Sequence, residues 1–483
     1  MKTSGILDNR QAGILMPVSS LPSPHGIGDL GDNAYAFLKT SKAMGFKIWQ
    51  LLPLNPLGYG NSPYQPFSSF AGDELYISLD LLTKKGLLEE VPPFHKFDTS
   101  IAYDDVREYK NIYLKKAFKK FTPDKDYEAF LKQAFWLEDY AQFMALKRLN
   151  HNRSWHEWTI KSLSEKDQKE KDYVCFLQYV FYKQWTALKD YAHDLDIMIM
   201  GDMPFYVGLD SADVYSHKSC FLLDKDGYPT SVAGVPPDYF SEDGQLWGNP
   251  LYDWTYLKKH HYSFWLQRLE WNNELFDIIR IDHFRAFDTY WKIPANETTA
   301  KNGRWIEGPA YDFFDVVFEK DPFLTVIAED LGDLRPEVLK LKDHYQMLGM
   351  RIIQYSFGPQ EEKENFKIPE FCISYTGTHD NSPVNGWYHD LSKIEKKRIR
   401  RIMHHFHYKG KTMADKVTYR ALDCDARVAI IPMQDLLDLE GDARINTPGT
   451  IGAPNWCWRL DSLTGYEHRT NHIKELLKKT SRL

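Results

Sequence analysis

Acidic residues follow short apolar runs at several places in this sequence. Residues 278–284 contain Arg280 and Asp282, which share one face if the run is a strand. Within aliphatic neighbours, such a pair is either a structural ion pair or a carboxylate that Arg280 keeps ionised, as a nucleophile requires. This segment alone leaves both interpretations open.

Two further runs end in the same way. Residues 324–330 end in Glu329 and Asp330, and residues 372–378 are followed by His379 and Asp380. Asp330 is the better candidate to cap a following helix, which leaves Glu329 free to act as a general acid. A metal site at His379 and Asp380 is the competing interpretation, but no second histidine at ligand spacing accompanies them. The sequence therefore favours no metal site.

Three acids at strand ends are typical of glycosidic chemistry. A retaining enzyme needs one carboxylate to attack the anomeric carbon and one carboxylic acid, about 5–5.5 Å away, to protonate the leaving oxygen. A third acid can support the positive charge of the transition state. The candidate catalytic residues are Asp282, Glu329 and Asp380, and this chemistry requires no cofactor.

Eight apolar runs of this kind, separated by helix-length segments, set the expected fold. Short runs rich in Ile and Val are typical of strands buried on both faces of a parallel sheet. Eight of them predict an α/β protein with a (β/α)₈ TIM barrel. The runs are residues 13–18, 48–54, 197–203, 278–284, 324–330, 350–355, 372–378 and 428–436.

Two intervals between the runs are much longer than a βα unit needs. Residues 85–195 carry apolar residues at three- and four-residue intervals, which predicts a largely helical insertion between strands 2 and 3. Residues 211–254 are rich in Gly, Pro, Asp and aromatics, which predicts an irregular loop between strands 3 and 4 that lines the active site. We expect residues 1–483 to form a single catalytic barrel without a separate carboxy-terminal β-domain.

Composition excludes several other classes of protein. The formal charge is −7 over 483 residues, which is too mild to favour nucleic acid. The five cysteines are scattered, and no stretch is long and apolar enough to span a membrane. Residues 396–411 are basic and contain His404, His405 and His407, which we interpret as a solvated helix face. We expect a cytoplasmic protein that binds neither membrane nor nucleic acid.

Further blocks give the sequence a family resemblance. Together with the segments around the three acids, the chain resembles the amylomaltases (disproportionating enzymes), the 4-alpha-glucanotransferases of glycoside hydrolase family 77. The matching blocks are residues 62–65 (SPYQ), 201–204 (GDMP), 236–238 (PPD), 244–248 (GQLWG), 280–285 (RIDHFR), 328–332 (AEDLG), 378–381 (THDN), 446–450 (NTPGT) and 455–456 (NW). Ala286 stands where the family usually has glycine, and residues 382–384 (SPV) also differ from its pattern.

The resemblance implies roles for the three acids. Asp282 resembles the nucleophile, Glu329 the general acid/base and Asp380 the transition-state stabiliser. The residues that match substrate-binding positions of the family are Tyr64, Asp202, Arg280, His283, His379, Gln245, Trp247 and Asn446.

The resemblance also implies an activity. A 4-alpha-glucanotransferase moves segments of α-1,4-glucan from a donor malto-oligosaccharide to the 4-hydroxyl of a glucose or glucan acceptor, by retaining double displacement. Its partners would be malto-oligosaccharides, maltose, glucose and larger α-glucans. A retaining α-1,4-glucan hydrolase with the same residues is the nearest alternative, and a non-catalytic carbohydrate-binding protein is the alternative from another class. The oligomeric state is left open.

Overall fold

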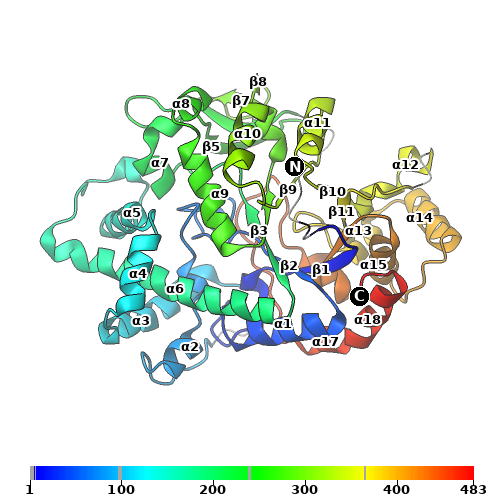
Figure 1. The fold of residues 1–483 in the computed structure, drawn as a ribbon, viewed down its shortest axis with the longest axis horizontal. Helices are drawn as coiled ribbons and strands as arrows, with labels where there is room; N and C mark the ends of the chain where they lie inside the picture. The colour runs from blue at the N-terminus through cyan, green and yellow to red at the C-terminus, as the bar shows by residue number, and fades with distance from the viewer. Residues whose placement is uncertain (1–4, 6, 96–99, 238–240, 364–365) are drawn as a thin grey trace.

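Eight parallel strands form a barrel at the centre of the molecule (Figure 1). The computed structural model describes residues 5, 7–95, 100–237, 241–363 and 366–483. The strands pair in the order β10-β11-β12-β1-β2-β3-β6-β9, and an isolated parallel bridge between Ile327 and Leu348 joins β9 to β10. They are β1 (Gln11–Leu15), β2 (Ile48–Gln50), β3 (Met198–Met203), β6 (Ile278–Ile281), β9 (Val326–Ala328), β10 (Gly349–Ile352), β11 (Cys372–Tyr375) and β12 (Val428–Pro432). This arrangement confirms the predicted barrel.

Several barrel strands end earlier than the apolar runs predicted. The run 350–355 leaves the sheet at Ile352, where the 3₁₀-helix Ile353–Phe357 begins. The run 428–436 leaves it at Pro432, where α16 (Met433–Leu436) begins. Apolar residues continue into these turns because the turns pack against the same core, so hydrophobicity alone did not show where each strand ends.

The barrel strands are buried because neighbours cover both their edges and their faces. Residues Ile14, Ile48 and Ile430 have no exposed surface. Gly13 on β1 allows the strands to approach closely, since a Cβ atom there would lie 2.6 Å from the backbone oxygen of Ile48. A larger residue at this position would push β1 and β2 apart.

Helices surround the barrel and fill its inserted segments. Those outside the region 85–195 are α1 (Asp32–Met44), α2 (Leu79–Lys84), α7 (Ala212–Ser216), α8 (Trp254–Lys259), α9 (Ser263–Leu275), α10 (Ala310–Lys320), α11 (Pro336–His344), α12 (Pro359–Lys363), α13 (Val384–Asp390), α14 (Lys393–His405), α15 (Met413–Asp423), α16, α17 (Thr464–His468) and α18 (Thr470–Lys479). At the end of the chain, α18 packs against α1 and α15.

Four α-helices lie within the described part of the region 85–195. They are α3 (Tyr103–Lys120), α4 (Lys125–Gln133), α5 (Leu137–Leu149) and α6 (Gln168–Asp194), and they gather at one side of the barrel (Figure 1). Aromatic side chains join them, as where the rings of Phe121 and Phe176 lie 4.9 Å apart.

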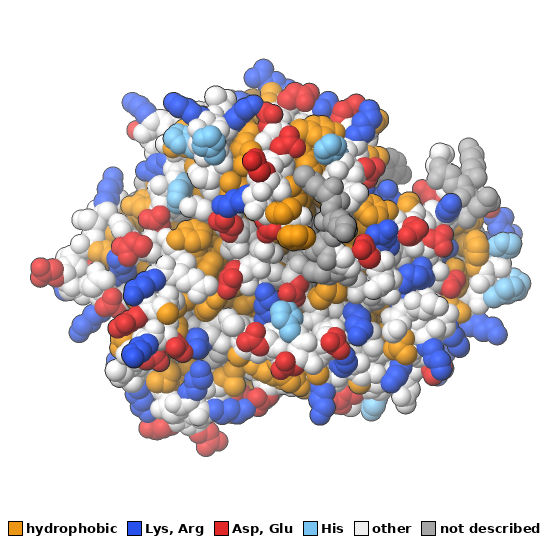
Figure 2. Space-filling view, viewed as in Figure 1, with side chains coloured by type: hydrophobic (Ala, Val, Ile, Leu, Met, Phe, Trp, Pro, Cys, Tyr) orange, Lys and Arg blue, Asp and Glu red, His pale blue; other side chains and the backbone are white. Residues whose placement is uncertain are grey.

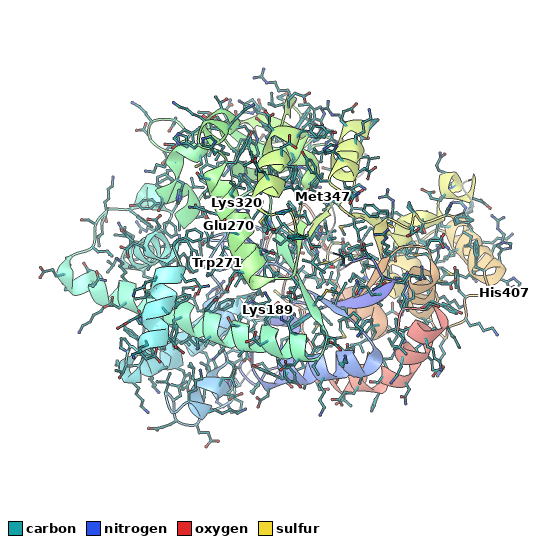
Figure 3. All side chains as sticks on the ribbon, in the orientation of Figure 1. Lys189, Glu270, Trp271, Lys320, Met347 and His407 are labelled. Atoms are coloured by element: carbon teal, nitrogen blue, oxygen red, sulfur yellow. The ribbon has the colours of Figure 1, made fainter. Side chains whose placement is uncertain are left out.

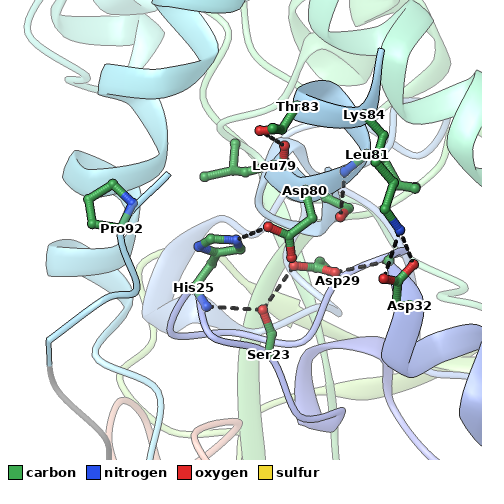
Figure 4. A network of polar contacts seen from close by, with 12 residues as sticks. Ser23, His25, Asp29, Asp32, Leu79, Asp80, Leu81, Thr83, Lys84 and Pro92 are labelled. Atoms are coloured by element: carbon green, nitrogen blue, oxygen red, sulfur yellow. Dashed lines mark hydrogen bonds and ion pairs between the residues drawn. The ribbon is translucent and has the colours of Figure 1, made fainter. Parts of the chain in front are cut away.

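A polar network ties the loop after β1 to α2, which precedes these helices (Figure 4). His25 is buried, and its Nε2 lies 3.0 Å from Oδ1 of Asp80 on α2. Ser23 donates a hydrogen bond to Asp29 within the same loop, and Lys84 forms an ion pair with Asp32 of α1. The network fixes the start of the helical region relative to the first barrel loop.

The region 211–254 is more regular than expected. It contains β4 (Ser231–Val235) and β5 (Gln245–Pro250), which form an antiparallel sheet of order β5-β4-β7-β8 with β7 (Thr289–Pro294) and β8 (Arg304–Glu307). The expectation of an irregular loop was wrong for these residues. β4 pairs with β5 inside the segment and with β7 beyond it. Glycine and proline within β4 and β5 hide the alternation typical of a strand.

The surface carries both signs of charge. Figure 2 shows acidic and basic side chains interspersed over one face. The side chains of His404, His405 and His407 are exposed at the end of α14, and Figure 3 shows His407 at the outer edge of the molecule. Among the described residues, no helix is long and apolar enough to cross a membrane.

Candidate active site

Two of the three acids stand side by side at the carboxyl ends of neighbouring strands. The β6–β9 ladder pairs Ile281 with Ala328, so Asp282 and Glu329 each come one residue after that pair. The backbone N–H of Glu329 donates to the oxygen of Ile281 at 3.1 Å. The parallel register therefore brings Asp282 and Glu329 to the same level of the barrel mouth, where barrel enzymes place their chemistry.

Arg280 lies beneath this pair and contacts two carboxylates. Its Nη1 lies 3.3 Å from Oδ1 of Asp282, so the two side chains share one face as predicted. It lies closer still to Asp202 on β3, at 2.6 and 2.7 Å from the two carboxylate oxygens. Arg280 and Asp202 are almost fully buried, whereas the side chain of Asp282 is 30% exposed. Asp202 thus neutralises most of the arginine charge, and Asp282 keeps an open side.

Tyr64 brings an aromatic face to the same group. Its hydroxyl donates to Oδ2 of Asp202 at 2.9 Å. Its ring stacks on His379, with centroids 5.3 Å apart and planes at 14°, and contacts Trp456 at 5.7 Å. Aromatic rings that lie next to buried polar groups are suited to binding a sugar, because a sugar ring has an apolar face and polar edges.

The pKa values of the two neighbouring carboxyls are both raised. Burial is the largest cause for each, and the charge of Asp282 adds to it for Glu329. Arg280 contacts Asp282 directly and favours its ionised form, whereas Glu329 accepts one backbone hydrogen bond, from His283 N at 2.7 Å. The arrangement favours a carboxylate on Asp282 and a proton on Glu329.

Asp330 does not cap a helix, so that expectation was wrong. Helix α11 begins only at Pro336, preceded by Arg335. Asp330 is buried, and its Oδ1 accepts a hydrogen bond from the backbone N of Met350 at 2.6 Å. This bond joins the end of β9 to β10, where the barrel has only an isolated bridge.

Asp380 lies on the loop after β11 and is held from the carboxy-terminal part of the chain. Nδ2 of Asn446 donates to its Oδ1 at 2.6 Å, and Arg444 donates to its backbone oxygen at 2.6 Å. Nε2 of His379 lies 3.5 Å from the same Oδ1. The side chain of Asp380 is 43% exposed and can reach a ligand in the barrel mouth.

Trp247 and Gln245 approach the acids from β5. The Trp247 ring lies 4.9 Å from the His283 ring in an edge-to-face contact, and its Nε1 donates to Gln245 at 3.1 Å. Burial lowers the pKa of His283 to about 4, so this imidazole is neutral at neutral pH. Its Nε2 has no hydrogen-bond partner among the described residues, which leaves it available to a substrate hydroxyl.

The structure brings all eleven candidate site residues into one connected set, and it adds three that were not among these candidates: Gln65, Arg444 and Trp456. Gln65 donates to the backbone oxygen of Trp247 at 3.3 Å and to Asn249, and so holds the β5 segment. Arg444 and Trp456 support Asp380 and Tyr64 as described above. Gln65 and Trp456 lie in the matching blocks 62–65 and 455–456, which could have marked them. Arg444 comes two residues before Asn446, and no local pattern marks it.

A separate cavity lies away from the three acids. This cavity of about 600 Å³ beside α11 is lined by Lys342, Arg351 and Arg427 among others, and by none of the three acids. Within the described part of the chain, no three His, Cys, Asp or Glu side chains group so as to hold a metal ion.

A parallel (β/α)₈ barrel with paired carboxyls, an arginine and stacked rings at its mouth defines the class of carbohydrate-active barrel enzymes. Comparisons with known proteins narrow this class. The sequence model of the 4-alpha-glucanotransferases matches residues 16–464. The chain is 41% identical to the 4-alpha-glucanotransferase of Aquifex aeolicus, covering 97% of this chain and 98% of that protein. It is 41% identical to that of Thermus thermophilus, covering 93% and 95%.

Solved structures agree with the sequence matches. The amylomaltase of Streptococcus agalactiae, solved in complex with acarbose, superposes with a TM-score of 0.92 at 35% identity, covering 98% of this chain and 99% of that one. The amylomaltase of Corynebacterium glutamicum, at 17% identity and a TM-score of 0.79, shares the fold. The chain belongs to the 4-alpha-glucanotransferase family, the amylomaltases of glycoside hydrolase family 77, and is an enzyme of that class.

Proposed function

We propose that this enzyme moves segments of α-1,4-glucan between malto-oligosaccharides by retaining double displacement, with Asp282 as nucleophile, Glu329 as general acid/base and Asp380 as transition-state stabiliser. The observation that carries the proposal is the pairing of Asp282 and Glu329 on adjacent strands, with Arg280 against the first and His283 N–H on the second.

In the first step, the carboxylate of Asp282 attacks the anomeric carbon of the donor. Glu329 gives its proton to the glycosidic oxygen, and the departing glucan leaves with a free 4-hydroxyl. The product is a glycosyl ester on Asp282. The ester carries no charge, so one cause of the raised pKa of Glu329 is removed and that pKa falls. Glu329 is then ionised and can act as the general base of the next step.

In the second step, Glu329 takes the proton of an acceptor 4-hydroxyl. That oxygen attacks the anomeric carbon, the ester bond breaks, and Asp282 leaves as a carboxylate beside Arg280. The stereochemistry at the anomeric carbon is inverted twice and so retained.

The remaining residues of the site bind and orient the sugar in this proposal. Tyr64 offers its ring face, and Asp380 places a charge near the developing oxocarbenium ion. The substrate-binding set also includes Asp202, Arg280, His283, His379, Gln245, Trp247 and Asn446, all of which lie in the connected set described above.

The substrates in this proposal are malto-oligosaccharides, maltose, glucose and larger α-glucans. The complex of the Streptococcus agalactiae relative with acarbose supports a site for oligosaccharides. We place the enzyme in the cytoplasm, where its five free thiols would be stable. We also treat the chain as one catalytic barrel with insertions at 85–195 and 211–254.

Incubation with maltotriose tests the transferase proposal against its hydrolase alternative. Transfer conserves the number of reducing ends and yields glucose with a ladder of longer and shorter glucans. Hydrolysis increases the number of reducing ends and yields shorter products only. A ladder at a constant reducing-end count is expected, and shortening with a matching rise in reducing ends would overturn the transferase assignment.

A further inference from the structure

The two acids at the barrel mouth are each followed by a turn, and a partly buried ion pair joins the two turns. After Asp282, the chain makes a single 3₁₀ segment, Phe284–Phe287, and reaches Asp288. After Glu329, it runs without regular structure to Arg335, just before α11. Asp288 and Arg335 are therefore the points at which the turns end and rejoin the scaffold.

The contact between Asp288 and Arg335 has two parallel hydrogen bonds. Nε of Arg335 lies 2.6 Å from Oδ2 of Asp288, and Nη2 lies 2.9 Å from Oδ1. Asp288 is buried, and the Arg335 side chain is 36% exposed. A planar guanidinium matched to a carboxylate in this way fixes orientation as well as distance.

Other contacts act between the same two turns. Arg285, in the turn after Asp282, donates to the backbone oxygen of Asp333 in the turn after Glu329. The Arg285 guanidinium also lies 3.7 Å from the Trp305 ring centroid on β8. The two turns are thus held to each other and to the antiparallel sheet.

These contacts join the two turns beyond the point where the hydrogen-bond ladder between β6 and β9 ends. The β6–β9 ladder ends with the pair Ile281–Ala328, and no further strand pairing joins the described residues of these two turns. Retaining chemistry requires the two carboxyls to stay about 5–5.5 Å apart. Displacement by about 1 Å can lower the rate of such a reaction about a hundredfold.

We infer that Asp288 and Arg335 are positioning residues, whose bidentate pair sets the separation of Asp282 and Glu329. The inference rests on the catalytic roles proposed above. Neither residue contacts either of the two acids in the structure, so both act through the turns that carry the acids.

The test compares Arg335→Ala, Arg335→Lys and Asp288→Asn with the parent enzyme in maltotriose transfer. Arg335→Ala should lower kcat about 10- to 100-fold with KM changed by less than about threefold, because substrate contacts remain. Arg335→Lys should recover only part of the loss, since a point charge cannot form both bonds. Asp288→Asn removes the charge of the partner and keeps its shape, and it should also lower kcat. This variant tests the role of the ion pair even if Arg335→Ala folds poorly.

Lys320→Ala is the matched control. Lys320 forms an exposed ion pair with Glu270 that joins α10 to α9, and the two labelled side chains lie together in Figure 3. This change should leave kcat within about twofold, because exposed pairs contribute little. An equal loss in Lys320→Ala would show a general response to removing an ion pair, and would overturn the inference.

A double-mutant cycle separates positioning from general stability. If Arg335 acts through Glu329, adding Arg335→Ala to Glu329→Gln should cause little further loss in kcat. Fully additive losses, or an unchanged kcat in both Arg335→Ala and Asp288→Asn, would overturn the inference. Full turnover in Glu329→Gln would instead contradict the catalytic role proposed for Glu329. Failure of the catalytic proposal can therefore be told apart from failure of the positioning inference.

Discussion

Asp202 and Arg280 face each other across β3 and β6 and form the tightest ion pair at the site. Both are buried, and Nη1 of Arg280 lies 2.6 and 2.7 Å from the Asp202 oxygens, against 3.3 Å from Asp282. The positive charge of Arg280 therefore favours the ionised form of Asp282, but Arg280 forms only one contact with it and not a bidentate pair. This balance suits a carboxylate that must leave its counter-ion to attack carbon.

Asp202→Asn should shift the pH dependence of the reaction. The charge of Asp202 raises the pKa of Asp282, so its removal lowers that pKa and moves the acid limb of kcat/KM to lower pH. The asparagine oxygen can still accept from Tyr64. Loss of one partner of a buried arginine should also destabilise the fold by about 3–5 kcal/mol.

Asp196→Asn is the control for that variant, because Asp196 forms an exposed ion pair with Lys42. It should change stability by less than about 1 kcal/mol and leave the pH profile unmoved. An acid limb of Asp202→Asn that stays in place or moves to higher pH would contradict the role given to Asp202.

Glu329→Gln should stabilise the folded protein in a pH-dependent way. Burial raises the pKa of Glu329, so its contribution to stability is fully present below the ordinary glutamate pKa of about 4.3 and is lost as pH rises through the raised value. Glutamine does not titrate. The excess in Tm of Glu329→Gln over the parent should therefore widen from about pH 4.5 upward.

Thermal unfolding measured across this pH range checks the prediction, with Glu138→Gln at the exposed end of a surface ion pair as the control. A difference in Tm that is constant with pH, or that narrows as pH rises, would show that Glu329 does not carry a raised pKa in the folded state.

Much of the site could be predicted because two of the three acids directly follow a short strand and Asp380 lies on the loop after another. Asp282 and Glu329 come at the ends of apolar runs, and strand alternation placed Arg280 beside Asp282. The closest partner of Arg280 could not be predicted from the residues alone. Asp202 lies far away in sequence, and only the register between β3 and β6 brings it opposite Arg280.

The errors have a common physical origin in contacts between distant segments. Strand β4 was missed because one of its two hydrogen-bond partners, β7, lies outside the segment that was judged irregular, and β5 pairs with β4 alone. Asp330 was expected to cap a helix, but a donor from the start of β10 satisfies it instead. The local sequence preference for strand or helix does not predict either contact, because both join segments that are distant in the sequence.

Trp247→Ala should increase the share of hydrolysis. Trp247 packs against His283, the residue that follows Asp282, so its truncation should admit water to the glycosyl ester. Trp247→Phe should preserve most of the transfer. The number of reducing ends formed per turnover of maltotriose should rise severalfold. This corresponds to a change of about 1 kcal/mol or more in the difference between the activation free energies of transfer and hydrolysis.

Leu246→Ala provides the matched control, since Leu246 is the exposed neighbour of Trp247 on β5 and alternates to the other face of the strand. Equal increases in hydrolysis in Leu246→Ala and Trp247→Ala would mean that the strand, rather than the indole ring, excludes water.

The nucleophile can be identified by trapping its ester. Glu329→Gln lacks the acid/base, but a maltosyl fluoride donor needs little acid assistance because fluoride is a good leaving group. The first step should then proceed and the second should stall, so the glycosyl ester accumulates. Mass spectrometry of the digested protein should find the added maltosyl mass on the peptide that contains Asp282. An adduct on Asp380, or turnover without any adduct and without loss of rate, would contradict the account.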